Sequence, residues 1–183
     1  MKILGISGSL RKNSFSGMLL NASSKLVPEG VEFEIADISQ IPMFNQDEET
    51  NMPAVVAALK SKVEAADAVV IATPEYNFSF SGVIKNTIDW LSRPYGKSSF
   101  KGKPTVFMAS SIGPFGGIRA WYQLQQVALG SGGMIMQNSP QIIVPTIQEK
   151  FDAAGELTDE TTKKYVTQSL AALVELAKMV RKA

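Results

Sequence analysis

Residues 67–73 read Asp-Ala-Val-Val-Ile-Ala-Thr, a short run that is apolar at successive positions and rich in β-branched side chains. A run of this kind is typical of a strand buried on both faces, as in a parallel sheet covered by helices. Pro74 follows directly, and because proline cannot donate to a strand ladder we expect the strand to end there.

Extended and helical patterns alternate on both sides of this strand. Further strands are predicted at Ile3–Ser7, Val31–Ile38 and Pro104–Ser110, with a fifth position shared by Met134–Met136 and Gln141–Val144 and interrupted by Pro140. Apolar residues at helical spacing predict helices over Ser16–Leu26, Pro53–Ala65, Val83–Leu91, Gly117–Leu129 and Thr158–Arg181, the last capped by Thr158.

Five strands, each followed by a helix, predict an α/β fold with a five-stranded parallel sheet, doubly wound, with helices on both faces. No repeat or linker divides the chain, so residues 1–183 are expected to form a single domain.

The composition excludes several kinds of chemistry, because the chain contains no histidine and no cysteine. Nucleophile systems that need imidazole or thiol are therefore absent, as are zinc and iron sites built on these residues, and we expect no metal site. Catalysis must use other side chains or a bound cofactor.

The formal charge of +1 gives no basic excess to suggest nucleic acid as a partner. The amino-terminal residues do not resemble a signal peptide, and no apolar run approaches the roughly 20 residues of a membrane span. A cytoplasmic protein that does not engage membranes is therefore expected.

In doubly wound sheets, ligands bind beyond the carboxyl ends of the strands, near the topological switch point. The loops after the first, third and fourth predicted strands should therefore carry the function. The first is rich in hydrogen-bond donors and leads into a helix, as Ser9, Arg11, Ser14 and Ser16 illustrate. A helix amino terminus with an arginine and hydroxyls nearby favours a phosphate site. The structural alternative is that Ser14 or Ser16 only caps the helix.

The type of phosphate ligand is not defined by this loop. The P-loop pattern is absent, and Gly5 and Gly8 do not complete a dinucleotide fingerprint. Asp37 stands where an NAD protein places its ribose-binding acid, although a turn-forming role is the simpler interpretation.

The second loop, residues 73–82, alternates aromatic rings with hydrogen-bonding groups. A flat heteroaromatic ligand needs a ring face to pack on and amide-like partners for its edge, which Asn77 and the backbone near Glu75 and Tyr76 offer. The alternative is a turn whose aromatic side chains fold back into the core.

Together, Gly-Ser-Leu-Arg-Lys-Asn-Ser-Phe-Ser at 8–16 and Thr-Pro-Glu-Tyr-Asn-x-Ser-x-Ser-Gly-x-x-Lys-Asn-x-x-Asp-Trp-Leu-Ser-Arg at 73–93 resemble the NADPH-dependent FMN reductase family. The likeness is greatest to its bacterial quinone and chromate reductases, with azoreductases as relatives. The chain has Ser16 where many relatives have Asn, and Ser81 where many have Pro.

The resemblance implies a flavodoxin-like fold that binds FMN at the carboxyl edge of its sheet. By the same resemblance, the FMN phosphate and ribityl chain would be held by Ser9, Arg11, Ser14, Phe15 and Ser16. The isoalloxazine ring would be lined by Pro74, Glu75, Tyr76, Asn77 and Phe78.

The third loop, residues 110–117, would meet the flavin and help receive the nicotinamide. Ser111 offers a hydroxyl, and glycines such as Gly113 let the backbone approach a ligand closely. For Gly116 and Gly117 a structural role in the turn is the favoured alternative.

The function implied is an FMN-dependent oxidoreductase with NADPH or NADH as co-substrate. It would reduce quinones, azo compounds, metal oxyanions such as chromate, or free flavin in a ping-pong scheme. The flavin would be the reactive group, with Tyr76, Asn77 and Ser111 positioning substrates and no catalytic acid or base from the protein.

Two alternatives remain: a flavodoxin-type electron carrier without its own NAD(P)H activity, and an NAD-binding protein using Asp37. The family also implies a homodimer or homotetramer. Large side chains such as Arg119, Trp121 and Tyr122 are candidate interface anchors, and Lys85, Asn86, Asp89 and Trp90 are assigned a structural or interface role.

Overall fold

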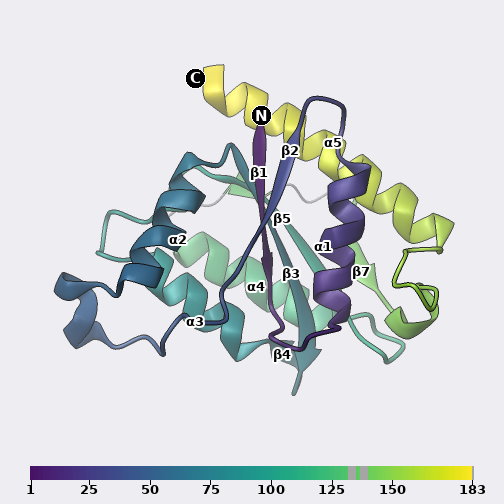
Figure 1. Cartoon of the computed structure of the whole chain (residues 1–183), viewed down its shortest axis with the longest axis horizontal. Helices are drawn as coiled ribbons and strands as arrows, with labels where there is room; N and C mark the ends of the chain where they lie inside the picture. Colours follow the sequence, from purple (N-terminus) through teal and green to yellow (C-terminus); the bar gives the residue numbers. More distant parts are fainter. Residues whose placement is uncertain (132–134, 137–139, 183) are drawn as a thin grey trace.

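A parallel sheet forms the centre of the structure, a computed structural model that describes residues 1–131, 135–136 and 140–182 (Figure 1). The strands run in the order β2-β1-β3-β5-β6, and β7 also pairs with β5. Their bounds are β1 Lys2–Ser7, β2 Glu32–Ala36, β3 Ala68–Tyr76, β5 Pro104–Ser110, β6 Ile135–Met136 and β7 Ile142–Val144. This order matches the 2-1-3-4-5 arrangement of flavodoxin-like folds and confirms the predicted fold class.

The fifth position of the sheet is divided between two strands. β6 pairs with Pro104 and Thr105, whereas β7 pairs with the segment from Met108 to Ser110. Because β3 occupies the other edge of β5, both short strands lie on the same side. Six parallel strands among the described residues thus fill five positions, whereas five strands were predicted, and the fifth position is shared by two segments as expected. Met134 and residues 137–139 lie outside the described residues.

Strand β3 does not end at Pro74, which corrects the expectation from the sequence. Pro74 is the last β3 residue to pair with β5, and the strand then continues to Tyr76 against β4 (Ser79–Phe80) in an antiparallel hairpin. The proline is tolerated because it stands where the strand changes partners. Asn77 and Phe78 form the two-residue turn with φ of 49° and 65°, the positive values that such hairpins require.

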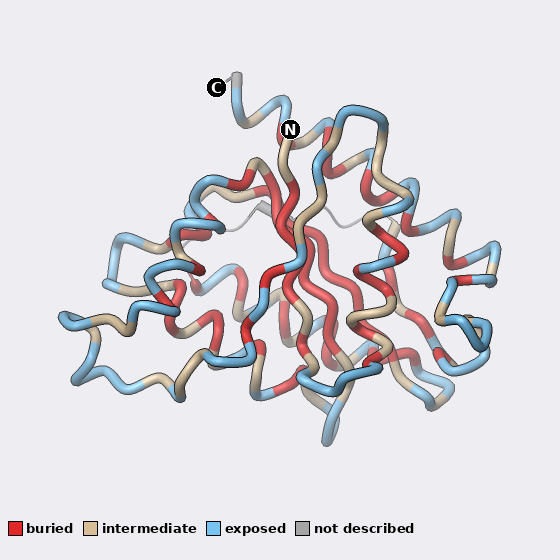
Figure 2. Tube along the Cα trace, in the orientation of Figure 1, coloured by how far each residue is buried: buried red, intermediate tan, exposed pale blue. Residues whose placement is uncertain are grey.

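In the part of the chain that the structure describes, five α-helices cover the sheet, with α1 and α5 on one face and α2, α3 and α4 on the other (Figure 1). Their bounds are α1 Phe15–Leu26, α2 Ala54–Ala65, α3 Gly82–Leu91, α4 Ile118–Gly130 and α5 Glu160–Lys182. Figure 2 shows the buried strands between these partly exposed helices. Within β3, Val69 and Ile71 belong to one apolar cluster, while Val70 and Ala72 belong to the other. This confirms the strand predicted to be buried on both faces.

The amino terminus of α5 differs from the prediction. Asp159, rather than Thr158, caps the helix: its Oδ2 accepts hydrogen bonds from the Thr162 backbone N–H at 2.8 Å and hydroxyl at 2.7 Å. The Thr158 hydroxyl instead donates to the carbonyl oxygen of Lys150. A carboxylate accepts both bonds and also complements the positive end of the helix dipole.

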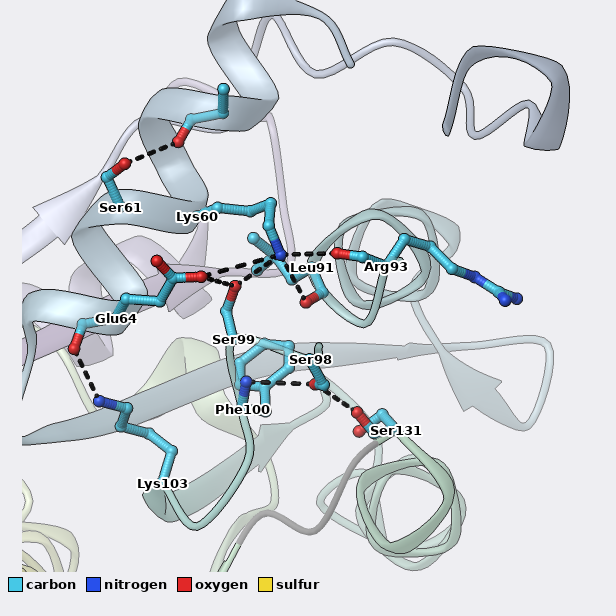
Figure 3. Close-up of polar contacts among 11 residues, drawn as sticks. Lys60, Ser61, Glu64, Leu91, Arg93, Ser98, Ser99, Phe100, Lys103 and Ser131 are labelled. Carbon is cyan, nitrogen blue, oxygen red and sulfur yellow. Dashed lines mark hydrogen bonds and ion pairs between the residues drawn. The ribbon is translucent and has the colours of Figure 1, made fainter. Parts of the chain in front are cut away.

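A polar network joins α2 to α3 and to the segment before β5 (Figure 3). Lys60 Nζ donates to the carbonyl oxygens of Leu91 and Arg93 and to Ser99 Oγ, at 2.7–3.4 Å. Lys103 Nζ donates to the carbonyl of Glu64 at the carboxyl-terminal end of α2. Burial lowers the pKa of Lys60 and of Lys103. These lysines stabilise the amino-terminal edge of the sheet, away from the loops assigned to function.

Within the ranges that the structure describes, no helix combines the length and the apolar character needed to cross a membrane.

Candidate functional site

A cleft of about 220 Å³ opens at the carboxyl edge of the sheet, where the loops after β1, β3 and β5 converge. It lies beside β1, whose neighbours β2 and β3 mark the topological switch point. The lining residues are Ser9, Arg11, Ser14, Phe15, Ser16, Pro74, Glu75, Tyr76, Ser110, Ser111, Ile112 and Ile147. The tertiary structure therefore brings together most of the residues singled out from the sequence.

The first loop delivers the amino terminus of α1 to the cleft. Ser14 caps the helix, with its Oγ accepting from the Gly17 backbone N–H at 3.1 Å, so the capping role considered for Ser14 is confirmed. A hydroxyl that accepts one bond still has its own proton to donate. The N–H groups of Phe15 and Ser16 have no protein acceptor among the described residues. Together with the exposed Arg11, these donors fit a phosphate group.

Gly8 allows the chain to pass close to β3 and α3 as it leaves β1 for this loop. Its N–H donates to the carbonyl oxygen of Ala72 at 2.6 Å. A Cβ at Gly8 would lie 2.8 Å from Ile84 Cγ1 and 3.0 Å from that same carbonyl oxygen. Only glycine therefore fits at this position without displacing β3 or α3.

The side chain of Glu75 is committed to α4. Its Oε2 accepts from the backbone N–H groups of Arg119 at 3.1 Å and Ala120 at 3.3 Å, and its Oε1 pairs with Arg119 Nη1 at 3.1 Å. The carboxylate thus occupies the positive end of the helix. The part of Glu75 that remains available to a ligand is its backbone. Pro74 also offers its backbone, and the half-exposed Tyr76 does so in part.

Asn77, Phe78 and Gly113 do not line the cleft. The first two form the exposed tip of the β3–β4 hairpin. Gly113 donates its N–H to Ser111 Oγ at 3.1 Å and accepts a bond from the Thr146 N–H. Contact between these three residues and a flavin stays a prediction.

In the third loop, Gly116 and Gly117 have structural roles. Both have positive φ, and a Cβ at Gly116 would lie 2.8 Å from the Pro145 nitrogen. Ser111, by contrast, is partly exposed in the cleft, with its backbone N–H bonded to the carbonyl of Val144.

Two parts of the site were missed from the sequence. Ile147 reaches the cleft from the loop after β7, and its signal was its place after the fifth strand position, at the same sheet edge. Arg119 lies outside the cleft lining and contacts the cleft residue Glu75.

Trp121, a candidate interface anchor, is instead buried, because its ring fills the core beneath α4. Its Nε1 donates a hydrogen bond to the carbonyl oxygen of Phe107.

Asp37 lies outside the cleft lining. Its Oδ1 accepts from the Ser39 backbone N–H at 2.8 Å, and hydrogen bonds from Ser39 hold the pKa of its carboxyl below the usual value. This geometry fits the turn-forming role. Among the residues described, no group of three or more Asp or Glu side chains is arranged to hold a metal ion.

The sheet order and the cleft define a flavodoxin-like α/β protein with a donor-rich helix terminus at its switch point. A family model described as NADPH-dependent FMN reductase matches residues 1–149. The chain belongs to this family and is an FMN-dependent NAD(P)H oxidoreductase. The family assignment gives no support to the electron-carrier alternative.

Individual relatives agree. The chain is 42% identical over 174 residues to an NAD(P)H-dependent FMN reductase of Pseudomonas aeruginosa, covering 94% of this chain and 93% of the relative. It is 38% identical over 185 residues to a quinone reductase of Escherichia coli, covering 99% and 97%. The solved structure of FerB, a flavoenzyme NAD(P)H:(acceptor) oxidoreductase of Paracoccus denitrificans, superposes with a TM-score of 0.86 at 36% identity, covering 97% of each chain.

Proposed function

We propose that the cleft is the FMN site and that the whole chain is one FMN-binding domain. The phosphate and ribityl chain are held by Ser9, Arg11, Ser14, Phe15 and Ser16, and the ring lies against Pro74–Phe78, Ser111 and Gly113. The observation that carries this proposal is the set of backbone N–H groups without a protein acceptor at the first turn of α1, beside Arg11. The positive end of the helix dipole favours an anion at this position.

FMN held by these residues would supply the redox chemistry between NAD(P)H and an electron acceptor. The residues around it bind and orient. Arg11 neutralises phosphate charge, the backbone of Glu75 and Tyr76 offers hydrogen bonds to the ring edge, and Ser111 contributes a hydroxyl. Tyr76, Asn77 and Ser111 position the nicotinamide and the acceptor. No side chain acts as an obligatory acid or base.

Quinones are the acceptor class that we favour. A quinone reductase of Escherichia coli and an NAD(P)H:quinone oxidoreductase of Solanum tuberosum, the latter 41% identical to this chain, support this choice. Azo compounds, chromate and free flavin are further candidate acceptors. Like quinones, each is a flat or small oxidant that can approach the flavin.

We further propose a cytoplasmic protein that assembles as a homodimer or homotetramer through the surface beside the cleft. Large apolar side chains are exposed on the loops there, including Leu10, Ile112 and Phe115, and burying them between subunits is favourable. Sedimentation of the purified protein at micromolar concentration tests this assembly, and a monomer would contradict it.

The decisive test of function is to purify the chain, record its flavin absorbance, and follow NADPH and NADH oxidation with and without benzoquinone. We expect a yellow protein whose NAD(P)H oxidation depends on the quinone. A yellow protein that oxidises neither nucleotide would indicate a carrier, and a chain that takes up no FMN would overturn the proposal.

A further inference from the structure

Arg119, in the first turn of α4, contacts both loops that form the ring side of the cleft. Its Nη1 lies 3.1 Å from Glu75 Oε1, at the end of β3. Its guanidinium carbon lies 4.7 Å from the ring centroid of Phe78, at the hairpin tip, and 5.0 Å from that of Phe115, in the third loop. One side chain thus joins the second loop to the third.

Beyond the sheet, both loops depend on contacts with neighbouring elements. β3 loses its pairing with β5 after Pro74, so Glu75 and Tyr76 pair with the short strand β4, and the Glu75 carboxylate also bonds the first turn of α4. A two-stranded hairpin of this size is marginal on its own. The third loop leaves β5 at Ser110, bonds the segment after β7 through the backbone of Ser111 and Gly113, and reaches α4 through two glycines at positive φ.

Gln123 lies one helical turn beyond Arg119 and contacts the hairpin alone. Its Oε1 accepts from the Ser79 hydroxyl at 2.6 Å, and its Nε2 donates to the carbonyl oxygen of Phe78 at 2.9 Å. Residues four apart share a helix face, so α4 holds the hairpin with both side chains. Of these two side chains, it is Arg119 that also contacts the ring of Phe115.

We propose that Arg119 is a positioning residue that holds the wall made by Pro74–Tyr76 and the wall made by Ser111–Phe115 at a fixed separation. This inference rests on the proposed function, because those walls are where the flavin ring would lie. The planar guanidinium suits the role: it pairs with a carboxylate in its plane while its faces pack against aromatic rings.

The direct test is amide hydrogen exchange of the full chain without added FMN, comparing wild type with Arg119→Ala. We expect exchange to rise about tenfold or more in both segments, 74–80 and 111–117, while the rest of the sheet is unchanged. Gln123→Ala should raise exchange in 76–80 alone. If Arg119→Ala changes one segment only, or neither, the proposal is wrong.

Two further variants distinguish the loss of the Arg119 contacts from a general loss of stability. Arg119→Lys keeps the charge beside Glu75 but lacks the planar group, so its exchange rates should lie between those of wild type and Arg119→Ala. Arg93→Ala removes another arginine that packs on a phenylalanine ring, at 5.4 Å from Phe44, and should leave both segments unchanged. An equal response to Arg93→Ala would overturn the proposal.

The FMN-loaded enzyme provides a second readout. Because the phosphate loop does not contact Arg119, Arg119→Ala should change the FMN dissociation constant by less than about threefold. It should lower kcat of the FMN-saturated enzyme about tenfold, since small displacements of reacting groups slow a reaction strongly. An unchanged kcat would contradict the positioning role. If wild type binds no FMN, the proposed function fails while the exchange result still decides whether Arg119 joins the loops.

Discussion

The side-chain oxygen of Asn86 accepts a hydrogen bond of 2.7 Å from the backbone N–H of Phe44, which lies 42 residues earlier in the chain. The Asn86 Nδ2 donates to the carbonyl oxygen of Pro42 at 2.8 Å, and Trp90 Nε1 reaches the same oxygen at 2.9 Å. The Phe44 and Trp90 rings pack in a T-shaped arrangement with 5.0 Å between their centroids. These family-motif residues therefore anchor the segment after β2 to α3.

Replacing Asn86 by alanine should lower the free energy of unfolding by about 1–3 kcal/mol, because the Phe44 N–H loses its acceptor and the Pro42 carbonyl loses one of its two donors. FMN affinity should stay within about twofold of wild type. Urea unfolding and FMN titration measure the two quantities. Lys85→Ala is the matched control, since its exposed pair with Asp89 is worth only about 0.3–0.5 kcal/mol. A weakened FMN affinity would place Asn86 in the binding machinery instead.

Arg11→Ala should raise the FMN dissociation constant about tenfold or more, because a charge-assisted hydrogen bond contributes about 1.5–3 kcal/mol and each 1.4 kcal/mol is tenfold. Once saturated with FMN, the variant should keep its kcat. Fluorescence titration with FMN measures the affinity. Lys12→Ala removes the neighbouring cation, which does not line the cleft, and should have a smaller effect. Equal effects would indicate a general electrostatic attraction and no specific contact.

Gly8→Ala should destabilise the fold by about 1–3 kcal/mol, the range for overpacking, because the added methyl meets Ile84 and the Ala72 carbonyl. Thermal or urea unfolding measures the loss. Gly82→Ala is the control: nothing lies within 4 Å of its Cβ position at the start of α3. That change should be neutral or slightly stabilising. A stable Gly8→Ala protein would show that the turn has room to relax.

Asp159→Ala should lower the free energy of unfolding by about 1 kcal/mol near pH 7, the usual effect of losing a helix cap. Hydrogen bonds from Thr162 hold the pKa of the Asp159 carboxyl below its usual value in the folded chain. The stabilisation is therefore complete above about pH 5, where the carboxyl is ionised in both states. It declines as the pH falls through about 4, where the unfolded chain takes up the proton first, and it is lost at the lower pH at which the folded carboxyl is protonated.

Urea unfolding of wild type and variant between pH 7 and pH 3 measures this difference. The difference between the two stabilities should shrink toward the acid end of the range. Thr158→Ala, which removes a hydroxyl that does not cap the helix, should have a smaller effect at every pH. A difference that stays constant with pH would argue against the charged cap.

The arrangement of strands and helices was largely predictable, because a buried face of a helix or strand requires apolar residues at the spacing of that element. This spacing is visible in the local sequence. The β3 run is apolar on both faces since both faces are covered, and the β5 bounds Pro104–Ser110 were predicted without error. The end of β3 was not predictable in this way. Whether a strand continues past Pro74 depends on β4, whose pairing becomes visible only when the hairpin forms.

The sequence by itself determined the fold class, the edge of the sheet where the site lies and the donor-rich loop at the start of α1, because these follow from local periodicity and composition. Only the tertiary structure decided where individual side chains point. Glu75 turns away to Arg119, 44 residues later, Phe78 stands exposed at a hairpin tip, and Trp121 is buried. The direction of a side chain depends on partners that are distant in the sequence. Local sequence patterns do not reveal which of these distant residues come into contact.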